Sequence, residues 1–128
     1  MEECPRAHAR TCAVARNAAE AGVTTEAFDA AALAHETESA LLGQLAEFPR
    51  IVRQAAELRE PHRIAFYLGD LAAAFHAFWN LGNDRPDKRI IMTQDEETTA
   101  ARLYLAAQIG QIIRNGLALM GVEAATSM

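Results

Sequence analysis

Apolar residues recur every three or four positions along much of the chain, the spacing of helices that bury one face. The clearest stretch lies between Pro61 and Leu81, where the apolar stripe is Ile64, Leu68, Leu71, Phe75 and Phe78. Residues three and four apart share one side of a helix, so this spacing predicts an α-helix with one buried face. The segment 82–87 (Gly-Asn-Asp-Arg-Pro-Asp) then predicts a loop.

A second amphipathic pattern opens at Thr93, which forms a capping-box pattern with Glu96, and ends at Gly121. Two adjacent apolar stripes predict a wide buried face, so we expect this helix to be central to the bundle. The stripes are Leu103, Ala106, Gly110, Ile113, Leu117 and Met120, with Leu105, Ile109, Ile112 and Leu119 beside them. Gly110 and Gly116 each cost roughly 1 kcal/mol of helix stability relative to alanine. We expect them where a neighbouring backbone comes close.

Residues that favour helix starts and helix ends also divide the amino-terminal part of the chain. A first helix is expected from about Pro5, a favourable first-turn residue, to Gly22, a natural helix stop. Thr24 or Thr25 can cap the next segment. That segment is expected to continue, either unbroken or with a break near residues 30–34, to about Glu47.

Two prolines punctuate the middle of the chain. A new helix is expected to begin at Pro49, after Phe48, and the following one at Pro61. Proline favours the first turn of a helix and disrupts its interior. A short helix of about ten residues is therefore predicted between them. The complete pattern predicts an all-α bundle of about five helices, a single domain over residues 1–128 with a short tail at 122–128.

Composition narrows the class of protein. The hydrophobic fraction of 51% supports a real core, and the low aromatic content of 6% suits packed helices. No apolar run approaches the roughly 20 residues that a membrane span needs. The first residues lack the basic region and apolar stretch of a signal peptide. We therefore expect a cytoplasmic protein with no membrane partner.

The charge distribution matters more than the net charge of −5, which argues against a general nucleic-acid binder and against DNA as partner. Residues 1–47 carry eight acidic and three basic side chains, whereas residues 48–128 carry nine of each. Residues 48–89 hold five acidic side chains against seven basic ones: Arg50, Arg53, Arg59, Arg63, Arg85, Lys88 and Arg89. A polyanion would approach this central stretch. The alternative is that these charges are ordinary solvated helix faces.

Candidate chemistry is sparse. Cys4, His8 and Cys12 are spaced four apart, but a zinc site needs three or four ligands in tetrahedral geometry. The nearest candidates for a fourth ligand, His35 and Glu36, share no metal-binding motif with them. We therefore interpret Cys4, His8 and Cys12 as helix-face or core residues. There is no phosphate-binding glycine loop and no serine in a nucleophile context. We assign no catalytic residue, no metal ligand and no cofactor.

Trp79 stands out because it lies beside the buried stripe, near the end of its predicted helix and next to a polar loop. An aromatic residue there is either part of the core or an exposed surface beside basic residues. The second arrangement is what stacking on an unpaired RNA base requires. The residues alone leave both readings open.

Several short motifs follow one another along nearly the whole chain, from about Ala7 to Met128. They are Ala7–Arg10, Leu45–Pro49, Glu60–Ala72, Phe75–Asn80, Ala101–Leu103 and Asn115–Val122, followed by a terminal methionine. In this order and spacing they resemble the carboxy-terminal DALR domain of class I arginyl-tRNA synthetases. The resemblance implies a helical bundle that holds the anticodon stem and loop of an arginine-accepting tRNA.

The resemblance also implies binding residues. The family places an aromatic side chain against anticodon-loop nucleotides at the position of Trp79, and Asn83 and Met128 lie in the same region. His76 stands where asparagine is frequent, so a hydrogen bond from that position is not carried over directly. Charge alone, and not the family, adds candidate phosphate contacts: Arg50, Arg53, Arg59, Arg63, Lys88 and Arg89.

One departure from the family concerns activity. The HIGH- and KMSKS-type signatures of the nucleotide-binding domain do not occur in this sequence. ATP and Mg²⁺ are therefore implied only for a full-length synthetase, whose catalytic domain would be a partner of this one. The chain alone is expected to be inactive, whether it is a fragment or a free-standing relative. Two alternatives remain: a helical protein-interaction or assembly module that has lost RNA binding, and an independent enzyme.

Overall fold

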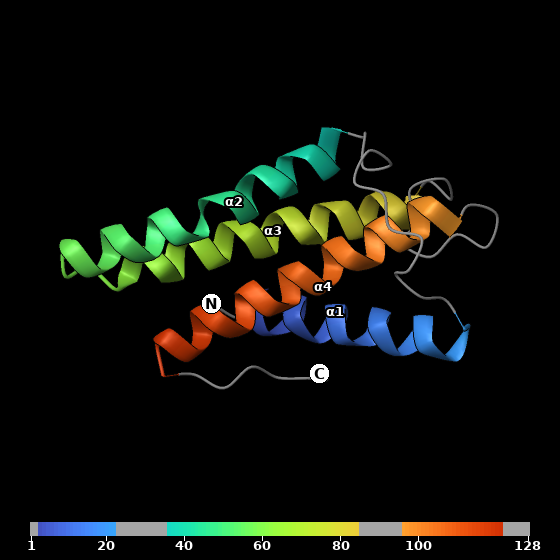
Figure 1. The fold of residues 1–128 in the computed structure, drawn as a ribbon, viewed down its shortest axis with the longest axis horizontal. Coiled ribbons are helices and arrows are strands. Elements are labelled where there is room, and N and C mark those ends of the chain that lie inside the picture. Colours follow the sequence, from blue (N-terminus) through green and yellow to red (C-terminus); the bar gives the residue numbers. More distant parts are fainter. Residues whose placement is uncertain (1–2, 23–35, 85–95, 122–128) are drawn as a thin grey trace.

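The computed structural model describes residues 3–22, 36–84 and 96–121. Its helices run up and down in a bundle, each roughly antiparallel to the one before it in the chain (Figure 1). They are α1 (Glu3–Glu20), α2 (Glu36–Glu57), α3 (His62–Asp84) and α4 (Glu96–Leu119). The predicted all-α class is confirmed, although the described residues form four helices where about five were expected. No helix in these ranges is long and apolar enough to span a bilayer.

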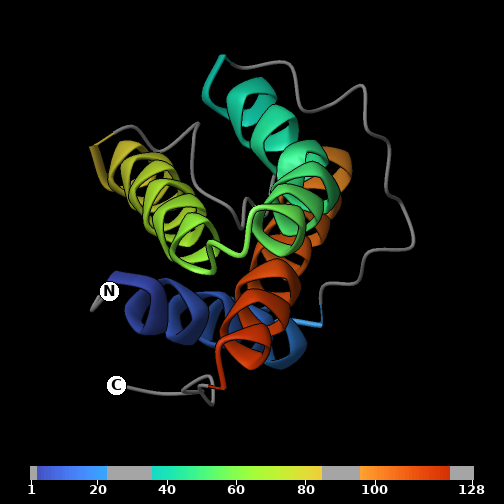
Figure 2. The same ribbon diagram turned by 90° about the vertical axis from the view of Figure 1, so that its left-hand side faces the viewer.

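The two central helices are α3 and α4, which pack against each other. Helix α2 packs mainly on α3, and α1 packs mainly on α4. Figure 2 views the bundle from the end at which a turn joins α2 to α3. Their shared core contains eight large apolar side chains that are almost fully buried: Leu41, Leu68, Leu71, Phe75, Leu105, Ile109, Ile113 and Leu117. Burying one such side chain contributes about 1.5–3 kcal/mol, so the predicted stripes of α3 and α4 dominate the stability of the bundle.

The two glycines of α4 lie where side chains of neighbouring helices come close. A Cβ atom on Gly110 would lie 2.4 Å from the Thr11 Oγ1 atom of α1, and one on Gly116 would lie 2.7 Å from Leu68 Cδ1 of α3. The neighbours are side chains and not the backbone that we expected. Leu119, predicted to be buried, is 57% exposed because it lies in the last turn of α4.

The predicted break at Pro49 is wrong, because Pro49 lies inside α2. An interior proline removes one helical hydrogen bond and costs about 3 kcal/mol. Tertiary packing on both sides of Pro49 offsets this cost. The centre of the buried Phe48 ring lies 5.6 Å from that of the Tyr67 ring of α3, and Ala55 is buried about two turns after Phe48. Helix α2 bends between its two halves (Figure 1) but continues. The separate short helix between the two prolines therefore does not form.

The helix ends agree in part with the sequence. Gly22 and Gly121 lie two residues after the ends of α1 and α4 and have positive φ angles of 73° and 76°, as expected for glycine helix stops. The predicted loop at 82–87 is wrong for its first three residues, because α3 continues to Asp84 with Gly82 buried. Residues 85–87, the capping residue Thr93 and the expected break at 30–34 lie outside the described residues.

Candidate nucleic-acid interface

Trp79 lies near the end of α3, where α1 crosses it. The side chain is partly buried and packs against the core. The Phe75 ring, one turn earlier on α3, lies 6.5 Å from the indole ring. From α1, the guanidinium carbon of Arg10 lies 5.4 Å from the indole centroid, within range of a cation–π interaction. Trp79 thus combines both sequence readings: it contacts the core and also carries a cation over its ring.

His76 holds this cation in place. The Nη1 atom of Arg10 lies 2.8 Å from His76 Nδ1. Arginine can only donate, so His76 Nδ1 accepts this hydrogen bond and the ring is unprotonated at that atom. Arg10, His76 and Trp79 together form a contact between helices that we call the α1–α3 cluster.

No sequence pattern predicts a role for Arg10. Its motif was among those that carry the family resemblance, but His76 lies 66 positions further along the chain. No local pattern relates two residues at that separation. Only the packing of α1 across α3 brings Arg10 and Trp79 together.

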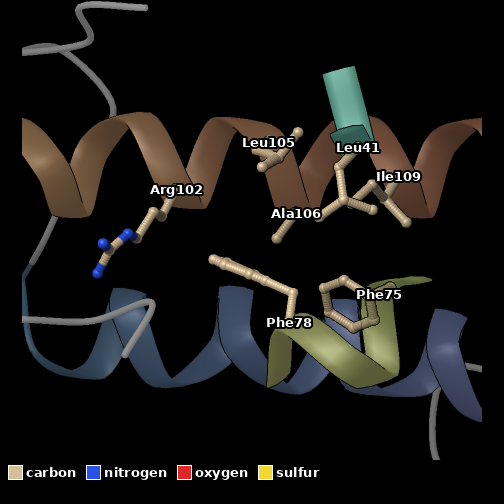
Figure 3. A pocket seen from close by; sticks show the side chains of 7 residues that line it. All are labelled: Leu41, Phe75, Phe78, Arg102, Leu105, Ala106 and Ile109. Atoms are coloured by element: carbon tan, nitrogen blue, oxygen red, sulfur yellow. The ribbon is translucent and has the colours of Figure 1, made fainter. Parts of the chain in front are cut away.

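A buried ion pair braces the same end of the bundle. Arg102 of α4 donates from Nε and Nη2 to Oε1 of Glu38 on α2, at 3.3 and 3.1 Å. The two side chains are only 4% and 2% exposed. Arg102 lines one small apolar hollow with Phe78, the residue before Trp79 (Figure 3); the other lining residues are Leu41, Phe75, Leu105, Ala106 and Ile109. The pair therefore connects α2 and α4 beside the segment of α3 that carries Trp79.

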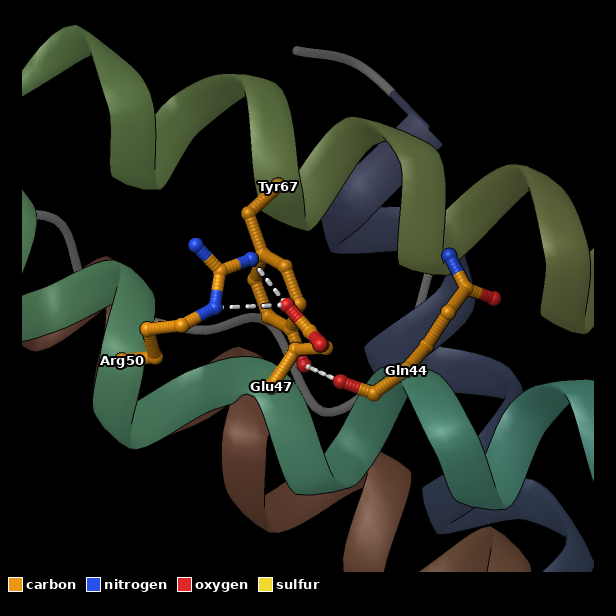
Figure 4. Close-up of polar contacts among 4 residues, drawn as sticks. All are labelled: Gln44, Glu47, Arg50 and Tyr67. Carbon is orange, nitrogen blue, oxygen red and sulfur yellow. Dashed lines mark hydrogen bonds and ion pairs between the residues drawn. The ribbon is translucent and has the colours of Figure 1, made fainter.

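The predicted arginines that the structure describes lie near the other end of α3. Arg50 and Arg53 are on the second half of α2, Arg59 is in the turn after it, and Arg63 is in the first turn of α3. Arg50 pairs with Glu47, beside the Tyr67 ring (Figure 4). Arg63 Nε lies 2.5 Å from Glu60 Oε2. The described members of the predicted binding set thus divide between the regions around the two ends of α3.

Tyr67 fixes the second half of α2 against α3. Its hydroxyl donates to the backbone carbonyl of Gln44 at 2.5 Å (Figure 4). Burial, together with the negative charge of Glu47, raises the pKa of Tyr67 to about 12. The hydroxyl therefore stays protonated and keeps donating at neutral pH.

The remaining predicted residues are described only in part. Asn83 lies in the last turn of α3, whereas Lys88, Arg89 and Met128 lie outside the described residues. In the described ranges, no three His, Cys, Asp or Glu side chains gather into a group that could hold a metal ion. His8 is fully buried in α1, and its Nδ1 atom lies 3.9 Å from the Cys12 thiol sulfur.

Known proteins match this chain along most of its length. The family model "DALR anticodon binding domain" matches residues 5–128. The chain is 58% identical over 122 residues to an arginine–tRNA ligase of Novosphingobium aromaticivorans, covering 95% of this chain and 21% of the relative. Arginine–tRNA ligases of Clavibacter sepedonicus and Ruegeria pomeroyi are 51% and 49% identical, each over 95% of this chain and 22% of the relative. The chain spans about a fifth of the length of these relatives. It belongs to the DALR anticodon-binding domain family.

Proposed function

We propose that this chain binds the anticodon stem and loop of an arginine-accepting tRNA. In a cell it would do so in the cytoplasm, as the anticodon-reading part of an arginine–tRNA ligase. The ligase reaction named for its relatives would then require the catalytic domain, where ATP and Mg²⁺ would bind. This chain's own task is to hold the tRNA in register for that domain.

The observation that carries the proposal is the α1–α3 cluster. RNA recognition of this kind exposes unpaired bases, which stack on aromatic rings and on the planes of arginine guanidinium groups. Trp79 offers an indole ring that is only partly covered by the core, with Arg10 directly over it. A base could stack on the remaining indole surface or on the Arg10 guanidinium plane.

The charges of the cluster favour an anionic ligand. Arg10 brings a permanent positive charge, and its partner His76 is an acceptor and not a carboxylate. The cation is therefore not neutralised by this hydrogen bond and can still attract a phosphate or a base oxygen. Asn83 and Met128 would add contacts to the loop, as the family resemblance implies. Arg50, Arg53, Arg59, Arg63, Lys88 and Arg89 are the candidate phosphate contacts.

The chain provides its own probe for the test, because Trp79 is its only tryptophan. Adding an arginine tRNA transcript should quench or shift the fluorescence of the wild-type protein. Binding of labelled transcript to Trp79→Ala should be weaker by roughly tenfold or more, since stacking on one base is worth about 1–3 kcal/mol. Trp79→Phe, which keeps an aromatic ring, should recover part of this affinity.

The matched control is Tyr104→Ala, which removes an exposed aromatic side chain from α4. It should bind like the wild type. Equal affinity of wild type and Trp79→Ala would exclude the stacking role, and equal affinity for an unrelated tRNA would exclude anticodon reading. Affinity should also fall steeply with salt, because phosphate contacts release counterions. A salt-independent association with another protein would favour the interaction-module alternative.

A further inference from the structure

The most exposed of the large hydrophobic side chains in the described ranges is Phe66, near the start of α3. Phe66 is 69% exposed, although Tyr67, the next residue of the helix, is buried. The His62 ring, one turn earlier, meets it edge-on, with centroids 5.6 Å apart and an interplanar angle of 70°. The two rings form an aromatic ledge on the outer side of α3.

This ledge lies in a part of the described chain that has a surplus of basic side chains. Residues 50–66 carry four arginines against only Glu57 and Glu60, a balance of +2 in a chain whose net charge is −5. Arg50 and Arg63 are each paired with a glutamate. Within the described ranges, Arg53 and Arg59 take part in no ion pair, so their charges face solvent.

The turn between α2 and α3 brings one of these charges to the end of the hairpin. Arg59 has a φ angle of 55°, in the left-handed region that glycine usually occupies after a helix. The N–H of Glu60 donates to the carbonyl of Ala55 at 2.9 Å, which closes the end of α2. We call the group Arg53, Arg59, His62, Arg63 and Phe66 the hairpin-end surface.

We infer that the hairpin-end surface is a second RNA contact, in which Phe66 packs on a ribose or unpaired base and the basic side chains contact phosphates. The inference rests on the proposed function. An exposed aromatic ring alone would fit a protein partner equally well. The surplus of positive charge around it favours a polyanion, and aromatic rings flanked by cations are the usual means of holding RNA without sequence-specific hydrogen bonds.

The geometry of α3 separates this contact from the α1–α3 cluster. Trp79 follows Phe66 by thirteen positions, which is about 20 Å along the axis at 1.5 Å per residue, and about 220° around it. The two aromatic residues thus face different sides of the helix. Phe66 would contact nucleotides other than those stacked on Trp79, outside the part of the loop that Trp79 engages.

The test measures binding of a full arginine tRNA transcript to Phe66→Ala, Phe66→Leu and Arg59→Ala. We expect Phe66→Ala to weaken binding roughly five- to tenfold, with Phe66→Leu in between. Arg59→Ala should reduce the slope of log affinity against log salt by about 1. The controls are Tyr104→Ala and Arg114→Ala, which remove an exposed aromatic and an exposed arginine from α4. Phe66 is exposed, so thermal unfolding should be unchanged in its variants.

The outcomes separate this inference from the proposed function. Trp79 fluorescence should still respond to the transcript in Phe66→Ala, at higher RNA concentration. Unchanged affinity in Phe66→Ala, with the Trp79 response intact, would overturn the second contact and leave anticodon binding standing. No Trp79 response in the wild type would overturn the function first. If the wild type self-associates in sedimentation and Phe66→Ala does not, the surface is a protein interface and the RNA assignment fails.

Discussion

The two ends of α3 present their aromatic residues in opposite ways. At the Trp79 end, the contacts join distant parts of the sequence. Arg10 of α1 lies over the ring, and the Glu38–Arg102 pair joins α2 to α4 beside Phe78, the residue before Trp79. At the Phe66 end, the contacts are local. His62 and Phe66 are four positions apart, and Glu60 and Arg63 are three.

The difference shows how a helical bundle can combine a rigid binding site with an adaptable one. A ring held by the core and by Arg10 of α1 keeps its orientation before a ligand arrives, which reduces the entropy lost on binding. An exposed ring on a hairpin end adjusts to its partner but adds little to stability. The two ends should therefore respond very differently to the same substitution.

The largest contrast is expected for the same change at two phenylalanines of α3. Phe75→Ala should destabilise the fold by about 3–5 kcal/mol, because it removes a side chain that is only 1% exposed and leaves a cavity. Phe66→Ala should change the free energy of unfolding by less than about 0.5 kcal/mol. Urea denaturation measures both. Similar losses for the two variants would mean that Phe66 is buried in solution.

The next contrast compares a buried with an exposed ion pair. Glu38→Ala should cost about 3–4 kcal/mol, because it leaves the Arg102 guanidinium buried without its carboxylate. Glu47→Ala removes the exposed partner of Arg50 and should cost less than about 1 kcal/mol. Chemical denaturation of the two single variants gives both values. A small loss in Glu38→Ala would show that water reaches Arg102 and that the pair does not brace this end.

A smaller effect is expected at Tyr67, which faces inward beside Phe66. Tyr67→Phe removes the hydrogen bond to the Gln44 carbonyl and should cost about 1 kcal/mol at neutral pH. Urea denaturation of the variant and the wild type measures the difference, and an equal free energy of unfolding would contradict the hydrogen bond.

The Tyr67 hydroxyl also predicts a pH dependence. Its pKa is about 12 in the fold, against an ordinary value of 10.0. Between these values the folded state binds more protons than the unfolded state, so stability falls as pH rises. The contribution of the Tyr67 hydroxyl to the free energy of unfolding is fully present below about pH 10 and is lost as the pH rises toward 12. Wild type should therefore lose more stability than Tyr67→Phe between pH 9 and about pH 11.5. Parallel losses in the two proteins would contradict the raised pKa.

The smallest effect is expected in the turn at the Phe66 end. Arg59→Gly should stabilise the protein by up to about 1 kcal/mol, because glycine adopts a positive φ angle without strain. The same change at Arg53, in the interior of α2, should destabilise it by about 1 kcal/mol. Thermal unfolding of both variants measures the shifts. If Arg59→Gly also destabilises, the guanidinium makes a stabilising contact at the hairpin end.

Much of the fold could be predicted from local patterns. The stripe from Ile64 to Phe78 is buried as its spacing indicates, and Gly22 and Gly121 end their helices. These features depend on residues a few positions apart, whose relation a helix fixes. The candidate site was predictable only in part: the family resemblance pointed to Trp79, and charge pointed to the arginines around the hairpin end.

The wrong predictions share one cause. Pro49 and Gly82 carry strong local signals for breaking a helix, yet both lie inside helices because neighbouring side chains pack against other elements. Phe66 went unnoticed because it lies off the apolar stripe of α3, and its exposure depends on which faces of α3 the other helices cover. Local propensities amount to a few kcal/mol, which the burial of two or three core side chains outweighs.

The sequence by itself therefore determined the all-helical class, the buried faces of α3 and α4, and the family. Tertiary structure alone decided which residues meet: Arg10 with His76 and Trp79, and Glu38 with Arg102. The physical reason is that helical periodicity fixes a residue's neighbours within one or two turns. The pairing of helices depends instead on burying all their apolar faces at once, and that joint packing also left Trp79 half covered and Phe66 open.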